Sequence, residues 1–166
     1  MGIFKKRQYG IINITNLDEK DIPVVPDGTW IKCSNCGKIL YKKSLEEHYS
    51  VCLNCNYHFR LGSYERINQI CDKGTFKEFN KYMKSKNPMD FQNYEEKLKA
   101  NEEKSKTNEA VVTGECEIGG NKAIIAVMDS NFLMGSMGTV VGEKITIAVE
   151  EATKRKLPII IFTASG

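Results

Sequence analysis

Two short stretches near the start of the chain, Cys33-Ser-Asn-Cys36 and Cys52-Leu-Asn-Cys55, are separated by fifteen residues. Each Cys-x-x-Cys pair forms a tight turn that directs two sulfur atoms toward one point, and Gly37 suits the sharp backbone of the first turn. Two such pairs at this spacing are typical of a zinc ribbon with four thiolate ligands. The sequence therefore predicts one zinc ion bound by Cys33, Cys36, Cys52 and Cys55.

The predicted zinc ion is structural, because four thiolates fill its tetrahedron and leave no position for water or substrate. A segment of about 30 residues has too small a core to fold alone, and zinc binding adds roughly 10–16 kcal/mol of apparent free energy to its folding. A thioredoxin-like redox pair, the alternative, needs a single motif within a βαβ unit. His48 and His58 are the other possible ligands nearby, with His58 the better candidate, and we expect both to lie outside the coordination sphere.

The composition, with 41% apolar and 27% charged residues, is that of an ordinary globular protein of one domain plus a small module. No run reaches the ~18 apolar residues of a membrane-spanning helix, and Met1–Arg7 lacks the apolar stretch of a secretory signal. We therefore expect a cytoplasmic protein without a membrane span. In such a reducing compartment Cys71 and Cys116, which have no partner spacing, are expected to be buried as small hydrophobic residues.

Changes of pattern divide the chain into four parts. Residues 1–29 form an irregular leader that ends in a turn, and residues 30–60 hold the zinc ribbon. Residues 61–109 are charged and are predicted to be a helical connector that leads into the next domain. Its section 95–106 has few apolar positions, so we expect a helix with a solvated surface. Residues 110–166 form the last part.

The last part has the pattern of strands and one helix. Two apolar runs, 109–118 and 122–129, predict strands joined by a glycine-rich hairpin turn. After a loop with two glycines, residues 139–154 predict a helix, and residues 157–163 predict a buried strand. A parallel connection through this helix gives a mixed sheet, so the predicted fold class is α/β.

The core of this last part is expected to be incomplete. The predicted helix presents Val140, Ile145, Ala148 and Ala152 to the core. The strand at 157–163 is so apolar that it needs cover on both faces, which one helix and one hairpin cannot provide. We therefore expect that the chain is a fragment or that a partner chain completes the domain.

The cysteine pairs are followed by an ordered series of motifs that covers nearly the whole chain. In chain order these are Glu109-Ala-Val-Val-Thr-Gly114, Val127-Met-Asp129, Asn131-Phe132, Gly135-Ser-Met-Gly138-x-Val-Val-Gly142-Glu-Lys144 and Pro158-Ile-Ile-Ile-Phe-Thr-Ala-Ser-Gly166. Each motif is weak alone, but the series resembles the β-subunit family of bacterial acetyl-coenzyme A carboxylase carboxyltransferases. That family continues past the position of Gly166 with a second glycine and further ββα turns, so we expect a chain truncated after the first glycine of a Ser-Gly-Gly motif.

The resemblance implies a four-cysteine zinc ribbon followed by the first part of a crotonase-like ββα domain, which starts within residues 61–109. In this family the subunit transfers a carboxyl group from carboxybiotin to acetyl-coenzyme A and forms malonyl-coenzyme A for fatty-acid synthesis. The implied partners are a carboxyltransferase α subunit in an α2β2 assembly, a biotin carboxyl carrier protein, which supplies the biotin, and a biotin carboxylase. This chain alone is expected to be inactive, because most of the family's domain is missing.

The resemblance also implies two substrate-side elements. Removal of a proton beside a thioester builds negative charge on the carbonyl oxygen, which fixed backbone N–H groups can stabilise by about 3 kcal/mol each. The family's donors correspond to the glycine pair that begins with Gly166, which is therefore the catalytic candidate. The loop of Gly135, Ser136, Met137 and Gly138 corresponds to the family's substrate-side loop and is expected to lie against the thioester or pantetheine arm. The alternative, a turn that serves only packing, stays open.

Two other function classes stay open as well. A nucleic-acid-binding zinc ribbon is supported by nearby basic and aromatic residues, although the net charge of +3 and the pI of 8.4 are modest. A non-catalytic assembly module is the other class. Steep salt dependence of RNA binding would favour the former, and stable complex formation without turnover the latter. The residues behind the nucleic-acid hypothesis are Lys5, Lys6, Arg7, Lys38, Lys42, Lys43, Arg60, Tyr41, Tyr49, Tyr57 and Phe59.

Overall fold

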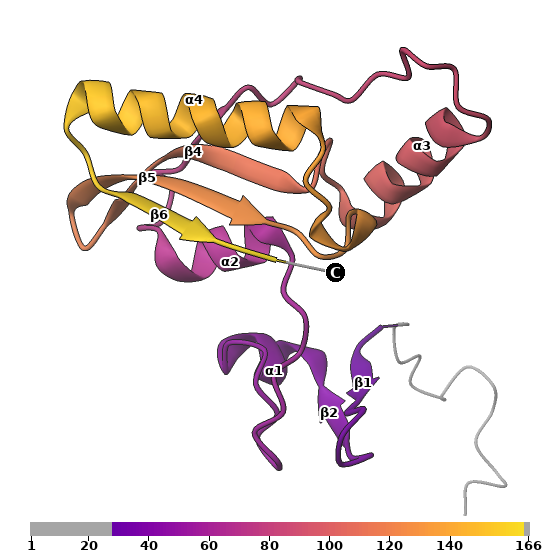
Figure 1. The fold of residues 1–166 in the computed structure, drawn as a ribbon. Coiled ribbons are helices and arrows are strands. Elements are labelled where there is room, and N and C mark those ends of the chain that lie inside the picture. The colour runs from indigo at the N-terminus through magenta and orange to yellow at the C-terminus, as the bar shows by residue number, and fades with distance from the viewer. Residues whose placement is uncertain (1–27, 165–166) are drawn as a thin grey trace, which may run out of the picture.

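The chain folds into a small ribbon and a larger α/β part, joined by a short linker (Figure 1). The computed structural model describes residues 28–164. Nearly all of the predicted leader, with its Lys5-Lys6-Arg7 cluster, therefore lies outside the described residues. In the ribbon, strands β1 (Trp30–Lys32) and β2 (Ile39–Tyr41) pair antiparallel, and helix α1 (Lys42–Glu47) follows.

The larger part is built on a four-stranded sheet with the strand order β3-β4-β5-β6. Its strands are β3 (Lys77–Phe79), β4 (Val111–Ile118), β5 (Asn121–Met128) and β6 (Ile159–Phe162). The first three pair antiparallel in turn, whereas β5 and β6 are parallel. The predicted mixed sheet with its parallel connection is confirmed. β3 was not predicted, and it lies within the segment that was expected to be helical.

β4 and β5 form the hairpin at the centre of the sheet. Their turn consists of Gly119 and Gly120, whose φ angles are +58° and +77°. Positive φ at both central positions is what a two-residue type I′ turn requires, and this turn matches the twist of the strands that it joins. The glycine pair therefore fixes the register in which Ile118 lies opposite Asn121.

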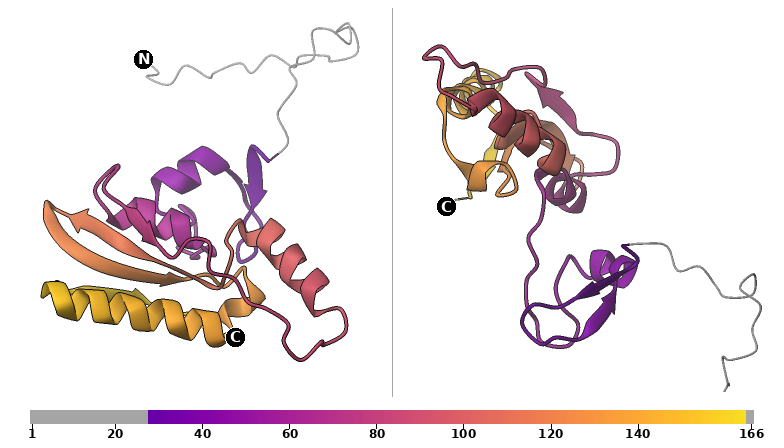
Figure 2. Two further views of the ribbon diagram at one scale, coloured as in Figure 1. Left: turned by 90° about the horizontal axis from the view of Figure 1, so that it is seen from above. Right: turned by 90° about the vertical axis from the view of Figure 1, so that its right-hand side faces the viewer.

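Helices cover both faces of the hairpin (Figures 1 and 2). Helix α4 (Thr139–Arg155) lies along one face, and helix α2 (Ser63–Ile70) lies on the other. Successive residues of a strand point to opposite faces, so Val111 packs in the cluster under α4 and Val112 packs in the cluster under α2. In the described part of the chain, no helix has the length and apolar character that a membrane crossing requires.

α4 connects β5 to β6 and buries one stripe of its surface. Its buried residues are Val141, Lys144, Ala148 and Ala152, at the spacing of three or four residues that an amphipathic helix has. The prediction was right for the two alanines and for Ile145, which is partly buried against the core. It was wrong for Val140, because the helix is rotated so that Val141 enters the core instead.

Lys144 is only 1% exposed, which is rare for a lysine. Desolvation lowers the pKa of its ammonium group, and the carboxylates of Glu78 and Glu109 act in the opposite direction. Glu109 is buried as well and accepts a hydrogen bond from the backbone N–H of Ser85 at 2.8 Å. The attraction of these two carboxylates offsets part of the cost of burying the charge of Lys144.

β6 forms one edge of the sheet and is only half covered. None of its four residues is fully buried, and Ile161 is 40% exposed. The predicted strand at 157–163 thus exists, but its burial was overestimated, because within residues 28–164 each of the four residues of β6 keeps part of its surface exposed. This agrees with the expectation that one helix and one hairpin cannot enclose it.

The segment between the ribbon and β4 is less helical than predicted. It contains α2, then β3, then a long loop, and then helix α3 (Tyr94–Ser105). α3 has no buried residue, which confirms the solvated helix expected at 95–106. β3 lies very close to β4: an ideal Cβ on Gly114 would stand 2.5 Å from the ring of Phe76 and closer still to the carbonyl oxygen of Lys77.

Gly114 is therefore expected to be intolerant of any side chain. Gly114→Ala should lower the free energy of unfolding by about 2–3 kcal/mol, because β3 must move away from β4 to make room. Gly142→Ala is the matched control, since that glycine lies within α4 with nothing within 4 Å of its missing Cβ, and it should raise stability by up to ~1 kcal/mol. Urea unfolding of both zinc-loaded variants measures this, and equal stabilities would contradict the close packing of β3.

Candidate functional site

The four paired cysteines converge within the ribbon. Their sulfur atoms all lie within 4.8 Å of one another, with 3.7 Å between Cys33 and Cys55 and 3.9 Å between Cys36 and Cys52. Four sulfur atoms on a tetrahedron with Zn–S bonds of about 2.3 Å stand about 3.8 Å apart. The geometry therefore fits one zinc ion with four thiolate ligands, as predicted.

Both cysteine pairs lie in turns of the same form. In the first turn the Gly37 N–H donates to the Cys33 carbonyl at 2.9 Å, and in the second the Asn56 N–H donates to the Cys52 carbonyl at 2.9 Å. Gly37 and Asn56 occupy equivalent places and have φ angles of +71° and +57°. Glycine and asparagine are the residues that adopt this conformation most readily. Local sequence thus determines the shape of both turns.

Polar groups around two of the cysteines favour the thiolate form. The backbone N–H of Lys38, and next the side chain of Asn54, lower the pKa of Cys36 to about 6. The side chain of Asn35 is the main cause of the lowered pKa of Cys55. Because zinc binds thiolates rather than thiols, these groups prepare the ligands for the metal.

The cluster leaves no room for another ligand. Two of its cysteines are buried and two are half-buried. Among residues 28–164, the group that could hold a metal ion consists of these four cysteines, so neither His48 nor His58 belongs to it. With four thiolates in place the zinc ion has no open position, and its role is structural.

A second candidate site lies at the edge of the sheet where β5 and β6 end. Because the two strands are parallel, with Val127 opposite Phe162 as their last pair, the loop after β5 and the residues after β6 emerge on the same side (Figure 1). The crevice outside the carboxyl ends of parallel strands is a common place for ligands in α/β proteins. The predicted loop of residues 135–138 lies here.

A close contact between Gly135 and Ala164 joins these two segments. Gly135 ends the 3-10 turn η2 (Leu133–Gly135), is buried and has a φ of +78°. An ideal Cβ on it would lie 2.9 Å from the Cβ of Ala164. Only glycine satisfies both the backbone angle and the close approach, so the structure gives Gly135 a packing role.

The next three residues of the loop differ from Gly135. Ser136, Met137 and Gly138 are exposed, Met137 by 67%. Gly138 precedes α4 with a φ of −88°, and the space around its missing Cβ is open. No side chain of the described residues caps this helix end, so the first N–H groups of α4 are available to an oxygen ligand or an anion.

Asp129 and Asn101 hold the loop in place from two sides. The Asp129 carboxylate is 1% exposed and accepts hydrogen bonds from the backbone N–H groups of Ser63 and Asn131, both at 2.8 Å. The Asn101 side chain on α3 accepts one from the N–H of Leu133 at 3.2 Å. The sequence prediction missed both roles. Asp129 stood in a recognised motif, but no local signal marks Asn101, whose partner is 32 residues away.

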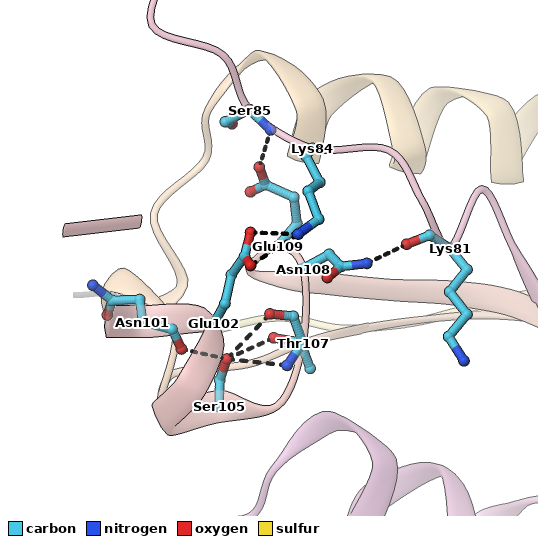
Figure 3. A network of polar contacts seen from close by, with 9 residues as sticks. All are labelled: Lys81, Lys84, Ser85, Asn101, Glu102, Ser105, Thr107, Asn108 and Glu109. Carbon is cyan, nitrogen blue, oxygen red and sulfur yellow. Dashed lines mark hydrogen bonds and ion pairs between the residues drawn. The ribbon is translucent and has the colours of Figure 1, made fainter. Parts of the chain in front are cut away.

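A polar network ties α3 to the chain around it, which keeps Asn101 in position (Figure 3). Lys84 and Glu102 form an ion pair at 2.8 Å, and the Asn108 side chain donates to the carbonyl of Lys81 at 2.6 Å. These contacts add to the limited apolar packing of α3, in which Leu98 is partly buried against the core.

A cavity of about 190 Å³ opens beside the same edge, on the side of α2. Arg66 lines this cavity and carries a positive charge, and its guanidinium carbon lies 5.6 Å from the centre of the Phe162 ring. The lining residues are Leu61, Arg66, Val127, Met128, Ser130, Phe162, Thr163 and Ala164. Gly166, the predicted catalytic position, lies outside the described residues.

Removing one zinc ligand should unfold the ribbon. Cys52→Ser is expected to lose the metal, because three thiolates hold zinc far more weakly than four, and residues 30–60 should then become sensitive to trypsin. His58→Ala is the control and should keep one zinc ion per chain with an unchanged digest. Metal analysis and limited proteolysis measure both variants, and full zinc content in Cys52→Ser would contradict the assignment.

Two family models match the chain. The model of the acetyl-CoA carboxylase zinc finger domain matches residues 30–55, and that of the carboxyl transferase domain matches residues 60–166. The first match contains all four zinc ligands, and the second contains the whole four-stranded sheet.

The chain is also similar to curated proteins named acetyl-coenzyme A carboxylase carboxyl transferase subunit beta. It is 55% identical over 167 residues to that of Clostridium novyi and 50% identical over 168 residues to that of Clostridium botulinum strain Hall, and each match covers 99% of this chain and 58% of the relative. A relative from Clostridium tetani, named subunits beta/alpha, is 47% identical, and 29% of its length is covered. The chain thus spans somewhat more than half the length of the first two relatives.

Solved structures share the fold. Transcarboxylase 12S with hydrolysed methylmalonyl-coenzyme A bound matches 75% of this chain and 21% of its own, with a TM-score of 0.55 and 22% identity. A single-chain, multi-domain long-chain acyl-CoA carboxylase matches 64% of this chain and 11% of its own, with a TM-score of 0.54 and 23% identity. These likenesses confirm the fold class predicted from the sequence. The family-model matches show that the chain belongs to the carboxyl transferase family, and the curated relatives to which it is similar are named as β subunits of acetyl-coenzyme A carboxylase.

Proposed function

We propose that this chain works in the cytoplasm as part of a carboxyltransferase that moves the carboxyl group of carboxybiotin to acetyl-coenzyme A and forms malonyl-coenzyme A. The observation that carries the proposal is its 55% identity, over 99% of its length, to a β subunit of that name. The edge of the sheet where β5 and β6 end supports it, because this edge has the features that such a reaction needs.

The reaction needs groups that stabilise negative charge on a thioester oxygen. When the methyl group beside the thioester loses a proton, the charge moves to the carbonyl oxygen, and fixed backbone N–H groups are the donors that suit it. The N-terminus of α4 offers uncapped N–H groups at the edge of the sheet. Gly166 lies two residues past Ala164, which packs against the loop, so we assign the main oxyanion donor to the Gly166 region.

The substrate-binding role is assigned to the exposed part of the loop. The exposed residues Ser136, Met137 and Gly138 lie at the edge of the sheet where β5 and β6 end, and no atom lies within 4 Å of the position that a Cβ on Gly138 would take. A thioester or pantetheine arm can therefore lie along this stretch of backbone. Gly135 does not contact the substrate in this proposal, and it sets the position of the three residues that do.

The partners follow from the same assignment. We propose an α subunit in an α2β2 assembly, with a biotin carboxyl carrier protein that brings biotin from a biotin carboxylase. The half-covered β6 supports a neighbour at this edge. The Clostridium tetani relative is named for both subunits, beta and alpha, which supports a close association of the two.

Nucleic-acid binding as the main function is not favoured, because the carboxyl transferase model covers residues 60–166. The ribbon does present a tilted ring pair of Trp30 and Tyr41, with centroids 5.4 Å apart and both rings exposed. We keep nucleic-acid binding as a secondary activity of the ribbon. A carboxyltransferase assay with and without RNA tests whether RNA binding affects the main reaction.

Gly138→Val tests the substrate-binding role. In the full-length subunit assembled with its α partner, acetyl-coenzyme A binding should weaken at least about tenfold, or 1.4 kcal/mol, because a branched side chain fills the open space. Stability should fall by no more than about 1 kcal/mol, since the φ of −88° suits any residue and only the glycine cap is lost.

Gly135→Ala is the matched variant for packing. The clash with Ala164 and the φ of +78° should lower the melting temperature clearly, while the folded fraction still binds acetyl-coenzyme A. Calorimetric binding and thermal unfolding measure both variants. If Gly138→Val binds acetyl-coenzyme A normally, residues 136–138 do not line the substrate site.

A further inference from the structure

The two cysteines outside the zinc ribbon lie next to each other. Cys71 directly follows α2, and together with Tyr64 and Ile67 it forms the stripe by which this helix packs on the sheet. Cys116 lies in β4, on the face that α2 covers. Cys71 packs against the apolar cluster to which Cys116 belongs.

Hydrogen bonds hold this end of α2 against β4. The N–H of Asp72 donates to the carbonyl of Glu117 at 2.7 Å. Cys71 is the residue before Asp72 and Cys116 is the residue before Glu117, so this hydrogen bond keeps the two cysteines on neighbouring segments of the chain. The N–H of Glu117 donates to the hydroxyl of Thr75 at 3.1 Å. The Asp72 carboxylate also accepts the N–H groups of the hairpin turn, at 3.1 Å from Gly119 and 2.7 Å from Gly120.

The two thiols differ in their access to solvent. Cys116 is fully buried, whereas Cys71 is half-buried. Burial is the main cause that raises the pKa of Cys116 to about 12, so Cys116 stays a protonated thiol at neutral pH. Because Cys71 is the more exposed of the two, a small oxidant reaches it first, and Cys116 lies in the apolar cluster against which Cys71 packs.

We propose that Cys71 and Cys116 form a reversible oxidation site that responds to peroxides. The Cys71 thiolate attacks one oxygen of hydrogen peroxide, the O–O bond breaks, and Cys71 becomes a sulfenic acid while hydroxide leaves. The sulfur of Cys116 then attacks the Cys71 sulfur, and the Cys116 proton leaves with the hydroxyl group as water. One peroxide is thereby reduced and two thiols are oxidised to a disulfide, which a dithiol reverses. This site is separate from the zinc thiolates and from the proposed carboxyl transfer.

Peptide mapping tests the proposal on the 166-residue chain. The zinc-loaded protein is treated with hydrogen peroxide, free thiols are alkylated, and trypsin is added. Cleavage after Arg66, Lys73, Lys106 and Lys122 gives peptides 67–73 and 107–122, each with a single cysteine. We expect these two peptides to be recovered joined, lighter by two hydrogens than their sum, and separate again after treatment with dithiothreitol. Zinc analysis of the same sample shows that the protein has kept its ribbon.

Single variants separate the two roles. In Cys116→Ser the sulfenic acid at Cys71 has no thiol to attack it, so dimedone should label peptide 67–73. In Cys71→Ser neither the joined peptides nor the label should appear. The oxidised wild-type chain should also unfold at a higher urea concentration than the reduced chain, and neither variant should show this difference. If peroxide leaves both thiols free while zinc is retained, or joins either of them to a ribbon cysteine, the proposal is overturned.

Discussion

The parallel pairing of β5 with β6 is the constraint on which the proposed substrate site depends. Two parallel neighbours cannot be joined by a tight turn, so the chain must cross over, and α4 makes this connection along one face of the sheet. The consequence is that the loop before α4 and the residues after β6 emerge at one edge. Gly135 against Ala164 closes the arrangement. Every feature assigned to substrate binding follows from this geometry.

The ribbon depends on a different kind of interaction. It has two short strands and one short helix, too little apolar surface to fold by burial, and the metal supplies the missing free energy. Its ligands are set by two local turns of the same form, with Gly37 and Asn56 in equivalent places. The larger part, in contrast, is held by clusters on both faces of the hairpin. The chain therefore combines two different sources of stability, which are metal binding in the ribbon and burial of apolar side chains in the larger part.

What the sequence predicted well is what nearby residues determine. The four zinc ligands, the hairpin turn and the helix that connects the parallel strands depend on spacing and period, and all were found. The parts that were missed depend on contacts between distant segments. β3 can pair with β4 only because Gly114 leaves room for Phe76, and no local pattern shows this. No local pattern shows that Lys144 is buried either. Nor does the sequence show that Gly135 serves packing whereas residues 136–138 of the same loop are exposed.

Hydrogen exchange of the backbone amides after β5 tests most directly whether this edge binds the substrate. The measurement compares the full-length, assembled carboxyltransferase with and without acetyl-coenzyme A, and it follows peptides that contain residues 136–141. We expect slower exchange in these peptides when acetyl-coenzyme A is bound, because the exposed loop and the first turn of α4 become covered. Unchanged exchange there, with slower exchange only in other parts of the assembly, would contradict the site proposed at the end of β5 and β6.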